Sequence, residues 1–142
     1  MIDKENIPPG WEIVKLGEVC EIVMGQSPAS STYNKKGIGL PFFQGKKEFT
    51  DLHPIAEKWC SAPNKIAQAK DVLISVRAPV GATNIADQIC CIGRGLAAVR
   101  YSYNYLFLFY FLRFIEKKLD EQGTGTTFKA ISGDVLRETD FP

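Results

Sequence analysis

The chain has 142 residues, of which 45% are hydrophobic and 23% are charged, and its formal net charge is +1. These values predict one globular domain, argue against wholesale disorder, and leave open a nucleic-acid binder whose basic residues cluster. The N-terminus is not a signal peptide and the longest apolar run, which Arg113 interrupts, is too short to span a membrane, so we expect a cytoplasmic protein without a membrane partner.

In the first third of the chain, we expect a flexible lead-in over residues 1–10 and an ordered region after it. Apolar residues recur at a helical spacing in residues 16–23, although a strand over residues 21–24 fits the same pattern. A polar loop over residues 25–39 follows, because serine, threonine, asparagine and glycine dominate it. Residues 41–45 then predict a short apolar strand.

The second half of the chain contains the clearest strand, residues 71–77. Three short strand patterns follow it closely, at residues 83–85, 88–92 and 96–100. Such close spacing favours an antiparallel meander, since parallel pairing needs long crossovers. A helix is predicted from about residue 102 to residue 122. The expected fold class is therefore α+β, with an antiparallel-rich curved sheet and a few helices in a single domain.

Residues 93–98 match the dinucleotide-binding fingerprint G-x-G-x-x-G/A, with Glu116 at about the right distance to bind a ribose. The context is wrong for that site. Residues 96–100 alternate like a strand where a helix should begin, and Glu116 falls inside the next predicted helix. We therefore interpret the glycines as a turn between two strands.

No catalytic or metal-binding residue is predicted. Adjacent Cys90 and Cys91 would point to opposite faces of a strand, so they cannot easily share a metal, and we expect small, reduced core residues. His53 is the only histidine, and its polar loop predicts a solvated side chain. The chain contains no nucleophile elbow, no Walker A loop and no cluster of carboxylates.

The remaining candidates for ligand binding lie in three polar loops, at residues 25–39, 44–50 and 123–129. Their amides and hydroxyls are the groups that read base edges, and guanidinium groups at strand ends suit phosphates. The arginines at strand ends are Arg77, Arg94 and Arg100. An alternative stays open, in which the loops are polar only because they face water and the domain is a structural or protein-interaction module.

Several motifs follow one another along nearly the whole chain. They are I-P-P-G-W-E-I-V-K-L-G-E-V at 7–19, G-Q-S-P at 25–28, D-V-L-I-S at 71–75, C-I-G-R-G-L-A-A-V-R at 91–100 and G-T-G-T-T-F at 123–128. In this order and rough spacing they resemble the target recognition domain of a type I restriction–modification specificity (S) subunit. The resemblance implies a single recognition domain over residues 11–142 that lacks the long spacer helices of the complete subunit.

The resemblance also implies a function. Such a domain reads one half of a bipartite sequence in double-stranded DNA and has no catalytic role, while methylation and cleavage belong to the modification and restriction subunits. No cofactor is expected in this chain, because S-adenosylmethionine, ATP and Mg would serve the partner subunits. A homodimer is a further expectation if the protein is half-sized.

The predicted DNA contacts come from the polar loops and the strand ends. Candidates for base contact or loop shaping are Gln26, Ser27, Tyr33, Gln44 and Thr126. Candidates for phosphate contact are Lys46, Lys47, Arg77 and Lys129. Arg94 either reaches a phosphate or braces its turn by bonding neighbouring carbonyls, and bracing is slightly favoured. The motif glycines and Leu96 are expected to belong to the scaffold.

Overall fold

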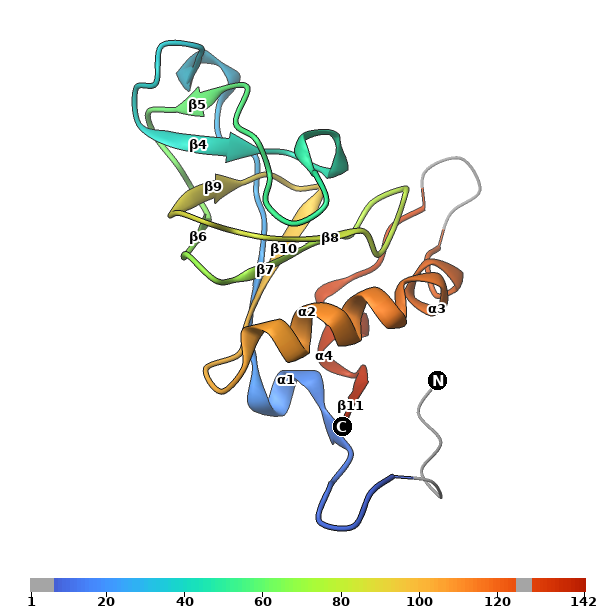
Figure 1. Cartoon of the computed structure of the whole chain (residues 1–142). Helices are drawn as coiled ribbons and strands as arrows, with labels where there is room; N and C mark the ends of the chain where they lie inside the picture. The colour runs from blue at the N-terminus through green and yellow to red at the C-terminus, as the bar shows by residue number, and fades with distance from the viewer. Residues whose placement is uncertain (1–6, 125–128) are drawn as a thin grey trace.

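The computed structural model describes residues 7–124 and 129–142, in which helices, a central sheet and an outer sheet are arranged as successive layers (Figure 1). The helices are α1 (Leu16–Val19), α2 (Tyr105–Phe114), α3 (Glu116–Glu121) and α4 (Gly133–Arg137), with 3₁₀ turns at Ser30–Thr32 and Lys46–Glu48. This arrangement agrees with the predicted α+β class. Within these residues no helix has the length and apolarity to cross a bilayer.

The central sheet is antiparallel throughout, with strand order β2-β10-β7-β8. Its strands are β2 (Glu21–Met24), β7 (Val72–Ser75), β8 (Thr83–Ile85) and β10 (Leu96–Arg100). Side chains of β7 alternate between two cores: Val72 and Ile74 face the helices, and Leu73 faces the outer sheet. Because both faces are buried, β7 reads as a continuous apolar run in the sequence.

The outer sheet has strand order β3-β5-β4-β9-β6. Its strands are β3 (Tyr33–Asn34), β4 (Leu40–Phe43), β5 (Trp59–Cys60), β6 (Ile66–Ala67) and β9 (Cys90–Ile92). A separate pair, β1 (Val14–Lys15) with β11 (Asp140–Phe141), joins the two ends of the described chain, and the ammonium of Lys15 lies 2.7 Å from a carboxylate oxygen of Asp140.

The predicted meander is wrong at β9. This strand pairs with neither β8 nor β10; instead it lies parallel to β4, with Phe42 opposite Cys91, and antiparallel to β6. Parallel pairing is allowed because β4 and β9 are far apart in the chain, so the intervening segments supply the crossover. The turn at residues 93–95 therefore carries the chain from one sheet to the other.

The predicted helix over residues 102–122 is divided at Ile115, whose φ of −97° and ψ of 12° interrupt the helical backbone. Asn104 caps α2, as its side-chain oxygen accepts a hydrogen bond of 3.0 Å from the Phe107 N–H. The break lets α2 and α3 bury residues in the same core, where Leu112, Ile115 and Leu119 lie. Further upstream, α1 followed by β2 confirms both of the patterns that overlapped in residues 16–23.

Candidate nucleic-acid interface

A groove of about 490 Å³ opens where loops of the central and outer sheets meet. Its lining comes from residues after β2, after β4, before β5, at and after the end of β7, and between β9 and β10: Ser27, Gln44, Gly45, Lys46, Lys47, Glu48, Glu57, Lys58, Ser75, Arg77, Ala78, Pro79, Arg94 and Gly95. Segments scattered over most of the chain therefore form one surface.

The structure brings most of the predicted DNA contacts together in this groove. Those that line it are Ser27, Gln44, Lys46, Lys47, Arg77 and Arg94. The sequence alone places these residues in separate loops. The loops come together because the chain passes from the outer sheet to the central sheet after β9. Amide, hydroxyl and guanidinium groups thus share one concave surface, which is the chemistry that base edges and phosphates require.

The Gly-Arg-Gly turn is the structural floor of the groove. A Cβ on Gly95 would lie 2.2 Å from the carbonyl oxygen of Gln44, and one on Gly25 would lie 2.0 Å from that of Gly93. These contacts require glycine, so Gly95 is a scaffold residue, as predicted, and Gly25 is one as well. The Arg94 N–H donates to the Ser27 hydroxyl at 3.2 Å, which fastens the turn to the segment after β2.

The Arg94 side chain does not brace the turn. Its guanidinium is exposed and bonds no carbonyl among the residues that the structure describes; the bracing contact is made by its backbone N–H. This geometry contradicts the slightly favoured interpretation and leaves the guanidinium available to a ligand. Ser27, in turn, shapes the loop through its hydroxyl.

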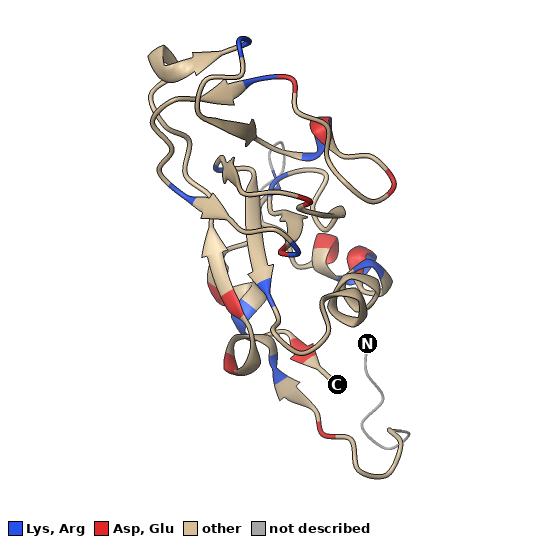
Figure 2. Cartoon of the chain, turned by 60° about the vertical axis from the view of Figure 1, so that its left-hand side comes forward, with Lys and Arg blue, Asp and Glu red and all other residues tan. Residues whose placement is uncertain are grey.

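Basic residues outnumber acidic residues around the groove, and Figure 2 shows lysines and arginines on the loops that meet there. Lys46, Arg77 and Arg94 have no ion-pair partner within the described parts of the chain. Lys47 lies 3.8 Å from Glu57, but the Lys47 side chain is 81% exposed, so this pair is weak. The groove consequently carries an excess of uncompensated positive charge.

Three of the other predicted contacts do not line the groove: Gln26, Tyr33 and Lys129. The Tyr33 hydroxyl donates to the Pro28 carbonyl at 2.9 Å and its ring packs on Phe42, so Tyr33 shapes its loop. Gln26 is exposed beside Ser27. The Lys129 ammonium lies 3.5 Å from a carboxylate oxygen of Asp120. Thr126 lies outside the described residues, as does most of the predicted lead-in.

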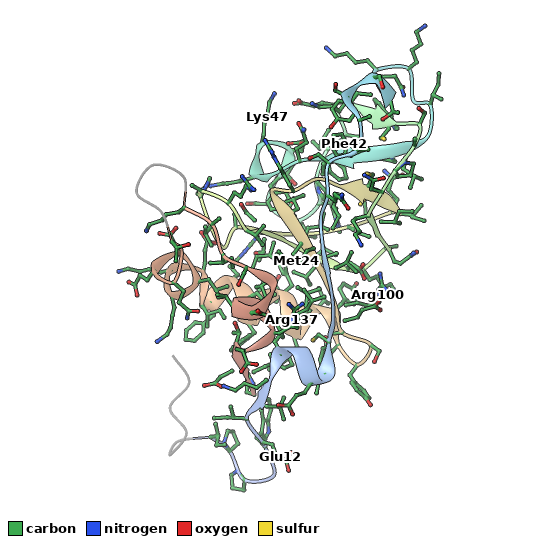
Figure 3. All side chains as sticks on the ribbon, turned by 180° about the vertical axis from the view of Figure 1, so that it is seen from behind. Glu12, Met24, Phe42, Lys47, Arg100 and Arg137 are labelled. Carbon is green, nitrogen blue, oxygen red and sulfur yellow. The ribbon has the colours of Figure 1, made fainter. Side chains whose placement is uncertain are left out.

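Arg100 is unavailable for a phosphate, contrary to the expectation for arginines at strand ends. Its Nε and Nη2 donate to the two carboxylate oxygens of Asp71, each at 2.8 Å, and its Nη1 donates to Glu21 at 2.8 Å. The hydrogen bonds to Asp71 raise the pKa of the guanidinium. Figure 3 shows Arg100 well away from Lys47. Arg100 is therefore a structural residue.

The cysteines and the histidine also belong to the scaffold. Cys90 and Cys91 are buried on opposite faces of β9, as predicted, and burial raises their pKa values to about 12 and about 11. These thiols stay protonated near neutral pH and are poor nucleophiles. His53 is half-buried rather than solvated, because its Nδ1 lies 2.8 Å from the Ile85 carbonyl oxygen.

The groove is also lined by residues that the sequence did not single out, among them Glu48, Lys58 and Ser75. Glu48 is only 5% exposed, and its carboxylate accepts the Gln44 N–H at 2.9 Å. Ser75 is buried, and its hydroxyl donates to the Arg77 carbonyl at 2.7 Å. Lys58 lies outside every loop that the sequence marked as polar. Only the pairing of β4 with β5 brings Lys58 beside Gln44, so no local signal could have found it.

Comparisons with known proteins agree with the family suggested by the motifs. Residues 8–142 match the model of the type I restriction modification DNA specificity domain. The chain is 45% identical to a Methanocaldococcus jannaschii protein named as the type I restriction enzyme MjaX specificity subunit, covering 96% of this chain and 33% of that protein. It thus spans about a third of the length of this curated relative.

Solved structures show the same fold. The HsdS subunit from Thermoanaerobacter tengcongensis matches with a TM-score of 0.85 and 55% identity, over 95% of this chain and 33% of that one. A second match is a chain from a structural study of complex assembly and conformational transition of the type I R-M system. It matches with a TM-score of 0.89 and 56% identity, over 96% of this chain and 34% of that one. An S subunit from M. genitalium shares the fold at 15% identity, with a TM-score of 0.72 over 99% of this chain and 35% of that one.

Proposed function

Because the chain belongs to the family of type I restriction modification DNA specificity domains, we propose that it is a non-catalytic domain that reads one half of a bipartite sequence in double-stranded DNA. The observation that carries this proposal is the groove, where side chains predicted to contact DNA converge from loops far apart in the chain. Convergence on one concave, basic surface favours DNA reading over loops that are polar merely because they face water.

The groove offers two kinds of contact. Arg77, Arg94 and Lys46 carry exposed cations without ion-pair partners in the described chain, so they suit the phosphate backbone. Gln44 presents an amide, which suits a base edge in the major groove. The mixture supports an interface in which charge gives affinity and a few polar groups give sequence preference.

The proposal extends to partners. Methylation and cleavage would belong to modification and restriction subunits, which would also hold S-adenosylmethionine, ATP and Mg, in the cytoplasm. Exposed apolar side chains one turn apart on α2 support a protein contact: Leu106, Tyr110 and Phe114. Where a protein has only one recognition domain, two copies would be needed to read both halves, and a homodimer is then the proposed state.

Replacing Arg77 or Arg94 with Gln tests the phosphate contacts. The complete specificity subunit, assembled with its modification subunit, is titrated with duplex DNA at several salt concentrations. Each substitution is expected to weaken binding for all sequences alike and to lower the slope of log affinity against log salt by about 0.9, because one released counterion is lost. Fluorescence anisotropy measures both quantities.

Arg137→Gln is the matched control, since Arg137 is an exposed arginine on α4, among the helices and distant from Lys47 (Figure 3). The control should retain the wild-type affinity and salt slope. Groove variants that bind like the wild type, or a control that loses as much as they do, would contradict the assignment of the groove to DNA.

A further inference from the structure

Gln44 is held in the groove from several sides. Its backbone N–H donates to the buried carboxylate of Glu48 at 2.9 Å. Its carbonyl oxygen faces Gly95 so closely that a Cβ there would lie 2.2 Å away. Its side-chain oxygen accepts a hydrogen bond from the ammonium of Lys58 at 3.0 Å. Backbone and side chain are both positioned before any ligand binds, which is the condition for accurate reading of a base.

The contact with Lys58 fixes which way the Gln44 amide faces. An ammonium group can only donate hydrogen bonds, so the amide atom 3.0 Å from it must be the oxygen Oε1 and not the nitrogen. The two N–H groups of Nε2 therefore point away from Lys58. Because Gln44 is exposed and lines the groove, the amide offers both of these donors to a ligand, while one of the two lone pairs of its oxygen is already engaged by Lys58.

Lys58 is itself held in place. Its ammonium lies 5.5 Å from the ring centroid of Tyr33 and 5.9 Å from that of Phe42, which are cation–π distances. Its backbone carbonyl accepts the Phe42 N–H at 3.0 Å. The two rings pack on each other, with centroids 4.7 Å apart. The outer sheet thus positions Lys58, and Lys58 positions Gln44.

We propose, resting on the proposed function, that Lys58 is a positioning residue that makes Gln44 a hydrogen-bond donor toward the major-groove edge of guanine. Guanine presents two acceptors there, N7 and O6, which match the two N–H groups of Nε2. Adenine is disfavoured, because its bidentate pairing with glutamine would have to share the amide oxygen with the cationic ammonium of Lys58. Cytosine presents only a donor and is disfavoured most.

The test measures methylation by the complete specificity subunit assembled with its modification subunit, on duplexes in which each position of the half-site is varied in turn. The wild type is expected to prefer guanine at one position. Lys58→Met keeps the apolar stem over the rings but removes the ammonium, so it should reduce the preference for guanine over adenine about tenfold at that position alone. Lys58→Arg restores a donor and should retain the preference.

Gln44→Glu provides an independent variant. A carboxylate only accepts hydrogen bonds, so the preference at the same position should move toward adenine or cytosine, whose exocyclic amino groups donate. Lys65→Met is the control, as Lys65 is an exposed lysine that does not line the groove, and it should leave every preference unchanged.

The outcomes separate the positioning role from the proposed function. If Lys58→Met lowers methylation equally for all sequences, Lys58 is a phosphate contact and the positioning role is overturned. The same conclusion follows if the wild-type preference survives both Lys58→Met and Gln44→Glu. If the wild-type complex shows no base preference in the half-site assigned to this domain, the proposed function fails, and this inference fails with it.

Discussion

Replacing Arg100 with Met is expected to lower the free energy of unfolding by about 3 kcal/mol, because it leaves a buried carboxylate without its cationic partner. Asp71 is 1% exposed, and the guanidinium of Arg100 bonds both of its carboxylate oxygens. After the substitution the Gln68 N–H, at 2.9 Å, would be the one donor among the described residues that remains bonded to that carboxylate. Urea unfolding followed by circular dichroism measures the loss.

Glu21→Gln is the control for this substitution. Glu21 bonds the same guanidinium at 2.8 Å, but its side chain is 63% exposed, so the expected loss is below about 1 kcal/mol. Adding Asp71→Asn to Arg100→Met should recover part of the stability, since the amide carries no charge. Equal losses for Arg100→Met and Glu21→Gln would show that burial of Asp71 does not govern the pair.

Gly25→Ala is expected to destabilise the chain by about 2 kcal/mol or more, because the new methyl group would overlap backbone atoms that cannot easily move. It would lie 2.0 Å from the carbonyl oxygen of Gly93 and 2.7 Å from that of Leu96. The Gly25 N–H also donates to the Leu96 carbonyl at 2.8 Å, so the two segments cannot separate without losing a hydrogen bond. The same urea titration measures the effect.

Gly45→Ala is the matched control, since Gly45 also lines the groove but has no atom within 4 Å of its added Cβ. Its φ of −174° is extended backbone that alanine adopts. The expected change is within about 0.5 kcal/mol. A Gly25→Ala variant as stable as Gly45→Ala would contradict the view that close backbone approach holds the Gly-Arg-Gly turn in place.

Much of the fold could be predicted because local patterns express it directly. The apolar run of β7 follows from burial on both faces, and the overlapping helix and strand patterns before Gly25 correspond to α1 and β2. The position of β9 could not be predicted, because pairing with β4 depends on segments far away in the chain. The short connections before and after β9 favoured an antiparallel meander, and this prediction was wrong for that strand.

The types of side chain in the site could be predicted from the sequence, but the residues that each of them contacts in the fold could not. Side chains such as Gln44 and Arg94 could be proposed from loop chemistry, and the structure places both in the groove. Arg100 has the same chemistry as Arg94, but its bonds to Asp71 and Glu21 join residues distant in sequence. Lys58 was missed for the converse reason, since its role depends on a neighbour across a strand pair.

Site-specific photo-crosslinking tests the central claim, that the groove is the surface that contacts DNA. A photoreactive amino acid replaces Arg94 in the complete specificity subunit, which is assembled with its modification subunit on a duplex carrying its methylation target. Crosslinks are expected from position 94 to one half of that target, and none from the same substitution at Arg137. Crosslinks from position 137 with none from position 94 would contradict the central claim.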